Sequence, residues 1–337
     1  MLCLPVTDKK LRQMDKQASI PVFTTSQTEQ ALTFKELIPA LREAFASGAE
    51  IPLRQHYHIP QPSGPDATLL LMPAWQQPAG YLGVKIVTVF PGNTARGLPG
   101  LASTYLLCDG VTGAHLALID GNQITVRRTV AVAALAASFL SRPDASSLLI
   151  VGAGRVASLL ADAFDHVRPL KSVEVWNISS EKAETLALAL RRKGFAARAV
   201  SSLDEAVHRA DIISCATLST EPLIKAEWLR PGTHLDLIGS FTPHMREVED
   251  AVMQVGKVFI DSKDALVESG DLIGPINAGL LRPEDIKATL HDLCAQRQTG
   301  RKNDDEITIF KAVGTALSDI TAGVLAYKRL TGLTPGE

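Results

Sequence analysis

The chain lacks a charge imbalance that would attract a polyanion. It contains 34 lysines and arginines against 36 aspartates and glutamates, which gives a formal net charge of −2 at pH 7. So small a charge produces no strong field for nucleic acid or for an anionic membrane surface. We therefore expect neither of them as a partner.

Cysteine is scarce, with four residues among 337. Cys3, Cys108, Cys215 and Cys294 are widely spaced and form no C-x-x-C pair, and three of them lie in or beside apolar runs. This pattern favours buried free thiols in a reducing compartment over a disulfide framework or a zinc site. The only histidines close together in the sequence are two residues apart and have no third ligand, so we predict no metal site.

The sequence also lacks a targeting signal and a membrane-spanning run. Its first ten residues, MLCLPVTDKK, have neither the basic start nor the long apolar core of a signal peptide. No stretch reaches the roughly 18 consecutive apolar residues that a membrane helix needs. We therefore expect a cytoplasmic protein.

What the sequence does contain is a change of pattern near residue 130. Before it, an early helix opened by a capping box at Thr33 and Glu36 is followed by strand-like runs rich in branched and aromatic residues. Asp109-Gly110 and Asp120-Gly121 predict hairpin turns. The first third is therefore expected to form a mixed sheet with one or two helices. The expected strands are TLLLMPAW, YLGVKIVTVF, ASTYLLCDG and AHLALIDGN.

After residue 130, short apolar runs alternate with helical segments. This alternation predicts a parallel sheet that helices cover on both faces. From about Ile307, the apolar spacing is helical, and we expect one long helix that packs back on the first domain. The expected parallel strands are residues 147–153, 172–177, 195–200, 211–217, 234–240 and 257–262.

A glycine loop stands between the first of these strands and a helix, in LLIVGAGRVASLLADAF. Gly152 permits the tight turn, Gly154 lets a pyrophosphate approach the backbone, and the small Ala157 lets the helix pack on the strand. The helix N-terminus adds free N–H groups and a partial positive charge. The alternative is a glycine turn in another kind of parallel-sheet protein. The predicted nicotinamide dinucleotide site comprises Gly152, Ala153, Gly154, Arg155, Val156 and Ala157.

The end of the next strand distinguishes NAD from NADP. An acidic residue there binds the ribose hydroxyls of NAD and repels the extra phosphate of NADP. The segment from Trp176 to Ser180 has no carboxylate, whereas Asn177, Ser179 and Ser180 can donate hydrogen bonds to a phosphate. We therefore expect NADPH as the cofactor, with NADH as the alternative.

Four cations stand in apolar surroundings: Arg54, Lys85, Arg127 and Arg128. A charge in an apolar stretch has to be paired or to bind something. One interpretation is a carboxylate pocket, because arginine matches a carboxylate with two N–H groups. The other is a set of structural ion pairs, or side chains whose apolar stems alone are buried. The residues by themselves leave both interpretations open.

These segments resemble the ornithine cyclodeaminase/mu-crystallin family over nearly the whole chain. The most specific matches are GVKIVTVFPGN, TYLLCDGVTGAHLALIDGNQIT ahead of an Arg-Thr pair, LIVGAGRVA and PGTHLDLIGSFTP. The resemblance implies an α/β protein in which a Rossmann-type doubly wound parallel sheet, residues 130–307, is inserted into an α+β domain. That second domain, residues 1–129 and 308–337, would bind the substrate and form a homodimer.

Residue by residue, the resemblance implies that Arg54, Lys85 and Arg128 hold a substrate carboxylate. Arg128 is preferred to Arg127 because it directly precedes Thr129, as in the Arg-Thr pair of the family. The residues that the resemblance places beside the nicotinamide are Thr217, Gly239 and Ser240.

One position departs from the ornithine cyclodeaminases of the family. They have an aspartate two residues after the glycine that matches Gly239, and this acid handles the distal amine of ornithine. The present chain has Phe241 there, which can neither transfer a proton nor bind an ammonium group. Asp236 lies earlier in the strand with a different facing. Cyclodeamination of ornithine is therefore disfavoured.

The segment HLDLIGSFTPHMREVED resembles instead the branch that reduces cyclic ketimines. An apolar side chain such as Phe241 suits the methylene face of the ring. The resemblance implies reduction of pyrroline-2-carboxylate to proline, or of piperideine-2-carboxylate to pipecolate, with Lys85 or an ordered water as the proton donor. The alternatives are an ornithine cyclodeaminase, an alanine or opine-type dehydrogenase, and a non-enzymatic binding protein. A binding protein would not need the three cations Arg54, Lys85 and Arg128, which we call the clamp.

Overall fold

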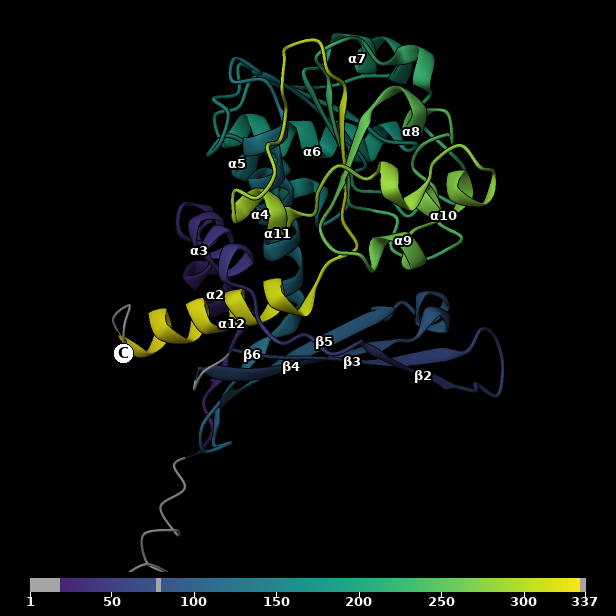
Figure 1. The fold of residues 1–337 in the computed structure, drawn as a ribbon. Coiled ribbons are helices and arrows are strands. Elements are labelled where there is room, and N and C mark those ends of the chain that lie inside the picture. The colour runs from purple at the N-terminus through teal and green to yellow at the C-terminus, as the bar shows by residue number, and fades with distance from the viewer. Residues whose placement is uncertain (1–18, 77–79, 334–337) are drawn as a thin grey trace, which may run out of the picture.

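The computed structural model describes residues 19–76 and 80–333. Cys3 and the first ten residues, for which no targeting signal is predicted, lie outside the described residues. The described chain builds two sheets (Figure 1). A six-stranded sheet has the order β1-β6-β5-β4-β3-β2, and a seven-stranded sheet has the order β12-β13-β11-β10-β7-β8-β9. The predicted fold class, a Rossmann-type parallel sheet joined to an α+β domain, is confirmed.

The six-stranded sheet is covered by helices on one face. α12 (Ala316–Thr331) lies on its middle strands, α2 (Thr25–Ala31) lies against β6, and α3 (Phe34–Ser47) packs on α12 (Figure 1). Along β4 the burial alternates, with Lys85 buried and Ile86 exposed. Only β1 runs parallel to its neighbour; the other pairs are antiparallel. The strands are β1 (Val22–Phe23), β2 (Gln55–Ile59), β3 (Ala67–Trp75), β4 (Tyr81–Val89), β5 (Leu101–Asp109) and β6 (His115–Asp120).

The seven-stranded sheet is parallel throughout and has helices on both faces. One face packs on α4, α5 and α6, and the other on α7, α8 and α10. The six strands predicted between residues 147 and 262 are all present. The strands are β7 (Ser147–Val151), β8 (Ser172–Trp176), β9 (Ala197–Ala199), β10 (Ile212–Cys215), β11 (His234–Leu237), β12 (Lys257–Ile260) and β13 (Thr308–Lys311). The helices are α4 (Gly121–Leu140), α5 (Ala157–Phe164), α6 (Ser180–Arg192), α7 (Leu203–Arg209), α8 (Val252–Val255), α9 (Ala265–Glu268), α10 (Gly270–Asn277) and α11 (Leu290–Cys294).

The prediction of one long C-terminal helix from about Ile307 is wrong for the residues before Ala316. Residues Thr308–Lys311 form β13, which pairs with β11 on one side and β12 on the other. The physical reason is burial: all four residues lie inside the sheet, where hydrogen bonds to two neighbouring strands outweigh a helical spacing. The predicted domain boundary at 307/308 therefore separates β13 from its own sheet, and the chain returns to the first domain only at Ala316.

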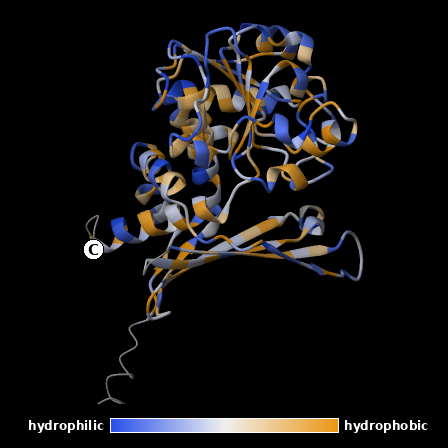
Figure 2. Ribbon diagram, in the orientation of Figure 1, coloured by the Kyte–Doolittle hydropathy of each residue, from blue (hydrophilic) through white to orange (hydrophobic). Residues whose placement is uncertain are grey.

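α4 connects the two sheets, and its beginning corrects a second prediction. Asp120-Gly121 does not form a hairpin turn, because Asp120 is the N-cap of α4 and accepts from the N–H of Gln123 at 2.9 Å. The helix packs on β5 of the first sheet and on β11 and β13 of the second. By length and composition alone it could cross a membrane, but 72% of its apolar window is buried inside the protein. Figure 2 shows that hydrophobic residues run along α4 and the central strands.

The N-terminal capping box is also different from the prediction. Thr33 precedes α3 as expected, but its hydroxyl donates to the carboxylate of Glu36 at 3.1 Å and makes no hydrogen bond to the helix backbone. A complete box between Thr24 and Gln27 opens α2, a helix that the sequence analysis missed.

The cysteines of the described residues are buried and free, as predicted: Cys108, Cys215 and Cys294. His56 and His58 lie on the exposed strand β2. Among residues 19–76 and 80–333, no group of three histidines, cysteines or acids is arranged to hold a metal ion.

Candidate active site

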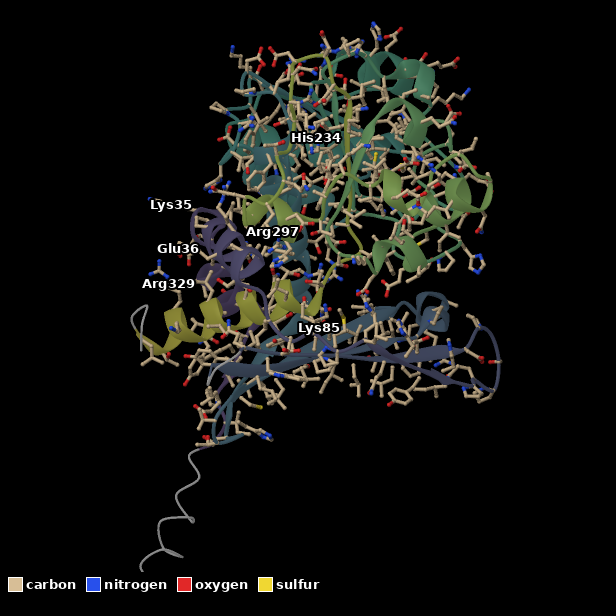
Figure 3. The ribbon with its side chains drawn as sticks, in the orientation of Figure 1. Lys35, Glu36, Lys85, His234, Arg297 and Arg329 are labelled. Carbon is tan, nitrogen blue, oxygen red and sulfur yellow. The ribbon has the colours of Figure 1, made fainter. Side chains whose placement is uncertain are left out.

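One buried carboxylate joins two of the predicted clamp residues. Lys85 comes from the helix-covered face of β4, Arg128 from α4, and Asp319 from the first turn of α12. Lys85 Nζ donates to Asp319 Oδ2 at 2.6 Å, and Arg128 Nε donates to Oδ1 at 2.9 Å. All three side chains are buried. Figure 3 shows Lys85 between the six-stranded sheet and the parallel-sheet domain above it.

Burial and charge act in opposite directions on this pair. Burial lowers the pKa of Lys85 to about 8, while the negative charge of Asp319 opposes this effect. Burial alone would raise the pKa of Asp319, but the charges of Lys85 and Arg128 outweigh it and lower that pKa. At neutral pH the site therefore contains an ammonium group that is close to giving up its proton, which is the property that a general acid needs.

Arg54 approaches the same place from the segment before β2. Its Nη2 donates to the carbonyl of Gly314 at 2.6 Å, and its Nε lies 3.1 Å from Glu268 Oε1. Gly314 has φ +82°, and a Cβ atom there would stand 2.3 Å from Arg128 Nη1. Both guanidinium groups therefore meet at Gly314, and the missing side chain lets them do so.

Arg127 points away from this site. It donates to the carbonyl of Leu32 at 3.0 Å and to Glu29 at 2.8 Å, and it lies over the ring of Phe34. Arg127 thus makes an ion pair apart from the other cations, whereas Arg128 binds the carboxylate that also holds Lys85. Because Arg54, Lys85 and Arg128 each pair with an acid of the protein, the carboxylate pocket at these three residues stays a prediction.

The glycine loop has the shape that a dinucleotide pyrophosphate requires. Gly152 has φ +115°, and a Cβ atom there would lie 2.6 Å from the carbonyl oxygen of Ala216. A Cβ atom on Gly154 would meet nothing within 4 Å, so the backbone is open on that side. Ala157 is fully buried at the first turn of α5, with the small size that helix–strand packing needs. Ala153, Arg155 and Val156 complete the turn and are at least partly exposed.

The end of β8 presents donors and no carboxylate between residues 177 and 180. Asn177 Nδ2 donates to the carbonyl of Ser179 at 3.1 Å, and the hydroxyl of Ser179 caps α6. Ser180 begins that helix and is exposed. The hydroxyls of both serines can still donate to a ligand.

Thr217 follows β10, and Gly239 and Ser240 follow β11, so they lie on the strand ends between the glycine loop and Gly314. Phe241 comes next and is 47% exposed. From the end of β13 to the end of β7 is three strand spacings, or roughly 14 Å. Most of the predicted site residues thus border one stretch of the carboxyl edge of the parallel sheet, where open α/β sheets bind their ligands. The exceptions are Asn177, Ser179 and Ser180, which lie beyond β7.

Sequence reasoning missed the acidic partners of the clamp. Asp319 stands in the first turn of a helix, where an acid is expected from the helix dipole alone. Glu268 and Asp264 are distant in sequence from Arg54, so only the fold reveals that they lie beside it, at 3.1 and 4.0 Å. The signal that was available was charge balance, because three cations in apolar surroundings require nearby acids.

A sequence model of the Ornithine cyclodeaminase/mu-crystallin family matches residues 20–333. The chain is 38% identical over 312 residues to Delta(1)-pyrroline-2-carboxylate reductase from Paracoccus denitrificans, covering 91% of this chain and 96% of the relative. It also resembles the structure of Thermococcus litoralis Delta(1)-pyrroline-2-carboxylate reductase in complex with NADH and L-proline, with a TM-score of 0.88, 34% identity, and 93% and 98% of the two chains covered.

A further solved structure is that of an archaeal alanine dehydrogenase dimer with bound NAD. Its TM-score is 0.86 at 28% identity, and the match covers 94% of this chain and 98% of that one. The agreement extends over both sheets, and the predicted family resemblance is confirmed. The chain belongs to the ornithine cyclodeaminase/mu-crystallin family.

Proposed function

We propose that the protein reduces a small cyclic imine carboxylate with a nicotinamide dinucleotide. The substrates would be pyrroline-2-carboxylate, giving L-proline, and piperideine-2-carboxylate, giving L-pipecolate. The observation that carries the proposal is that Arg54, Lys85 and Arg128 gather on the same sheet edge as the glycine loop. The relatives named as pyrroline-2-carboxylate reductases support it.

The residues divide the work as follows. Arg54 and Arg128 bind the substrate carboxylate with the guanidinium groups that meet at Gly314. Lys85 gives a proton to the ring nitrogen, and its own nitrogen is held in place by Asp319. A bound nicotinamide would supply the hydride for the C=N carbon, so that one hydride and one proton together convert C=N to CH–NH. Holding the partners in this geometry can contribute roughly 7–11 kcal/mol to catalysis.

Phe241 supports a cyclic imine over ornithine. An exposed aromatic side chain after β11 offers an apolar surface to the methylene groups of a ring. A cyclodeaminase would need an acid at this position for the distal amine. An alanine dehydrogenase remains the second candidate, because one of the solved relatives carries that name.

For the cofactor, we propose NADPH in preference to NADH. The support is the set of donors at the end of β8, Asn177, Ser179 and Ser180, without a carboxylate to repel a 2′-phosphate. The solved relatives contain NADH or NAD, so the coarser assignment to a nicotinamide dinucleotide does not depend on this preference.

We also propose a homodimer that forms through the open face of the six-stranded sheet. Among the described residues, no helix covers this face (Figure 1). Neighbouring strands present apolar side chains there in register, with Leu71 opposite Ile86 and Val84 opposite Leu106. An extended apolar face that is exposed in one subunit is typical of a subunit interface. The alanine dehydrogenase relative is a dimer.

The test is a substrate panel with purified protein. Pyrroline-2-carboxylate, piperideine-2-carboxylate, pyruvate with ammonia, and ornithine are each assayed with NADPH and NADH by absorbance at the nicotinamide band. We expect oxidation of the reduced dinucleotide with the cyclic imines, fastest with NADPH. Turnover of ornithine, or of pyruvate with ammonia, without turnover of either imine would refute the proposal.

Two adjacent arginines provide a matched pair of variants. Arg128→Ala removes a charged hydrogen-bond donor to the substrate, worth about 1.5–3 kcal/mol, so KM for the imine should rise by roughly 10- to 150-fold. Arg127→Ala removes a neighbour on the same helix that points away from the site, so KM should stay within about twofold. Equal effects on KM from both variants would show that the clamp is misplaced.

A further inference from the structure

A second buried carboxylate, that of Glu247, holds together the ends of β10 and β11. These two strand ends lie between the clamp and the glycine loop. Glu247 is fully buried, and its Oε1 accepts from the N–H of Thr217 at 2.8 Å and from the Thr217 hydroxyl at 2.9 Å. Its Oε2 accepts from the N–H groups of Gly239 at 2.8 Å and Ser240 at 3.2 Å. Glu247 therefore binds the end of β10 with one oxygen and the end of β11 with the other.

This bridge begins where the sheet stops. The last ladder pair of β10 and β11 is Cys215 with Leu237, and one more backbone bond joins Ile238 to Cys215 at 3.0 Å. Beyond it the two strand ends are held together through Glu247. A Cβ atom on Gly239 would lie 2.2 Å from the carbonyl oxygen of Thr217 and 2.3 Å from Glu247 Oε1, so only glycine fits here.

The bridge needs an ionised carboxylate. Burial raises the pKa of Glu247, and the charge of Lys311 opposes it. Four donors already point at the two oxygens, which leaves no favourable place for a proton. Lys311, fully buried on β13, lies 3.9 Å from Glu247 Oε2 and 3.2 Å from Asp271 Oδ2, so its positive charge is shared by these two carboxylates.

The topology indicates which part of a dinucleotide passes over these strand ends. β7 carries the glycine loop, with β8 on one side of it and β10 on the other, so the strand order reverses there. A dinucleotide spans such a switch point, with its pyrophosphate on the glycine loop and its two halves on opposite sides. The predicted ribose contacts at Asn177, Ser179 and Ser180 place the adenosine half beyond β8. The nicotinamide half then lies over the ends of β10 and β11.

We infer that Glu247 is a positioning residue for the nicotinamide half of the bound dinucleotide. By fixing Thr217 against Gly239 and Ser240, Glu247 holds in place the backbone surface that the nicotinamide ribose and ring contact, between the glycine loop and Lys85. The inference rests on the proposed function only for the class of cofactor and not for the substrate. A misplacement of about 1 Å at a reacting atom can cost about 100-fold in rate, so this surface has to be rigid.

The test separates the two halves of the cofactor by isothermal titration calorimetry. Glu247→Gln keeps the size of the side chain but turns an NH2 group toward backbone N–H donors, so the bridge is lost. We expect NADPH to bind at least 10-fold more weakly, whereas 2′-phospho-ADP-ribose, which lacks the nicotinamide, should bind within about twofold of its original affinity. The same contrast should hold between NADH and ADP-ribose. A general loss of folding would weaken both ligands of a pair.

The matched control is Asp236→Asn, which alters another fully buried carboxylate on β11. Asp236 accepts from the hydroxyl of Ser214 at 2.5 Å and bonds to no strand-end backbone group. It should leave both ligands of each pair within about twofold. Thr217→Val is a milder second variant, since it removes one of the four donors and should weaken NADPH alone, by a smaller factor than Glu247→Gln.

The outcomes distinguish the inference from the proposed function. Equal weakening of NADPH and 2′-phospho-ADP-ribose, or no change in either, would overturn the role of Glu247. Failure of the imine assay with normal dinucleotide binding would overturn the proposed substrate and leave this test intact. Absence of binding of NADPH and NADH to the unaltered protein would overturn both.

Discussion

Lys85 combines burial, a fixed position and a pKa of about 8 at a single nitrogen atom. If its ammonium group protonates the imine, catalysis requires the charged form, which exists below that pKa. We therefore expect kcat/KM for the cyclic imine to decrease as pH rises through about 8. The measurement is the initial rate of NADPH oxidation between pH 6 and pH 10.

The variant Asp319→Asn shows whether the decrease in rate belongs to Lys85. The negative charge of Asp319 raises the pKa of Lys85, so its removal should move the decrease to lower pH. Ionisation of the free imine is the same for both proteins and cancels in the comparison. A decrease at an unchanged pH in Asp319→Asn would assign it to the substrate or to a water molecule.

At the scale of the residue, the cations of the candidate site were easier to predict from the sequence than the acids that pair with them. Lys85 and Arg128 stood out because their sequence neighbours are apolar, and the structure brings both to Asp319. Glu247 gave no such signal. It lies in the polar segment REVED, and its importance depends on backbone N–H groups that follow β10 and β11, which no local pattern reveals.

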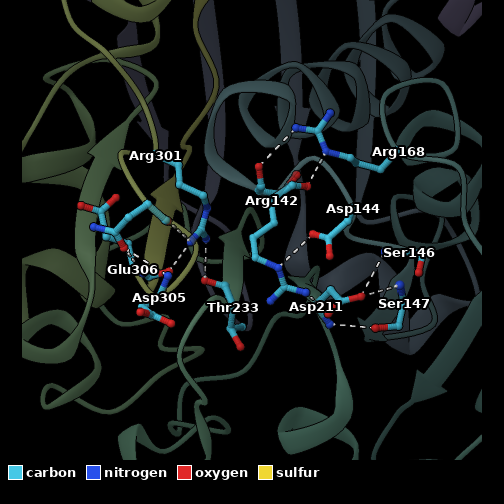
Figure 4. A network of polar contacts seen from close by, with 12 residues as sticks. Arg142, Asp144, Ser146, Ser147, Arg168, Asp211, Thr233, Arg301, Asp305 and Glu306 are labelled. Atoms are coloured by element: carbon cyan, nitrogen blue, oxygen red, sulfur yellow. Dashed lines mark hydrogen bonds and ion pairs between the residues drawn. The ribbon is translucent and has the colours of Figure 1, made fainter.

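At the scale of the element, the amino end of the parallel sheet is joined to α4 by arginines (Figure 4). The last carbonyls of a helix have no partner inside it. Arg168 donates to the carbonyl of Ser141 at 3.2 Å, and Arg301 to that of Leu140 at 2.7 Å. Asp211, at the start of β10, accepts from Arg142 and Arg230 and from two backbone N–H groups after α4. It thereby fixes the connection from α4 to β7.

We expect Asp211→Asn to lower the free energy of unfolding by about 3 kcal/mol at pH 7, because it leaves partly buried guanidinium groups without their carboxylate. Burial alone would raise the pKa of Asp211, but the hydrogen bonds from Ser146, Ser147 and Arg230 hold it well below its usual range. The folded-state pKa is thus depressed. The stabilisation is complete above the unfolded pKa of about 3.9 and is lost as pH falls through the folded value.

Urea denaturation of both proteins at pH 7 and at pH 3 measures this difference, which should be smaller at pH 3. Asp144→Asn serves as the control, because Asp144 also pairs with Arg142 but is 79% exposed, so the change should be within about 0.5 kcal/mol. A difference for Asp211→Asn that is independent of pH would show that the carboxylate charge is not its source.

The elements that the sequence predicted well are those with one local signal. The six strands between residues 147 and 262 were found because each is a short apolar run between helices. β13 was missed because TIFK runs directly into residues with helical spacing, and its strand form depends on β11 and β12, which pair with it from elsewhere in the chain. Asp120-Gly121 is ambiguous by itself, because aspartate favours both turns and helix N-caps.

At the scale of the whole molecule, the change of pattern near residue 130 predicted two sheets, since hydrophobic periodicity differs between half-covered and fully covered strands. Contacts between the two parts of the chain were beyond local patterns. Arg54 and Glu268 are 3.1 Å apart in space but separated by most of the sequence, and α4 belongs to the core of both sheets. The site exists only where these parts meet.

The open face of the six-stranded sheet gives the prediction for the assembly. Ile86 is 38% exposed there, on the opposite face from Lys85. In a two-fold dimer each substitution occurs twice, so Ile86→Lys buries two charges, each at a cost of several kcal/mol. We expect sedimentation equilibrium at micromolar concentration to give a dimer for the unaltered chain and a monomer for Ile86→Lys. Leu188→Lys, which alters a 43% exposed leucine on α6 of the other domain, should remain a dimer. A monomeric unaltered chain, or an Ile86→Lys dimer of unchanged stability, would show that this face is not the interface.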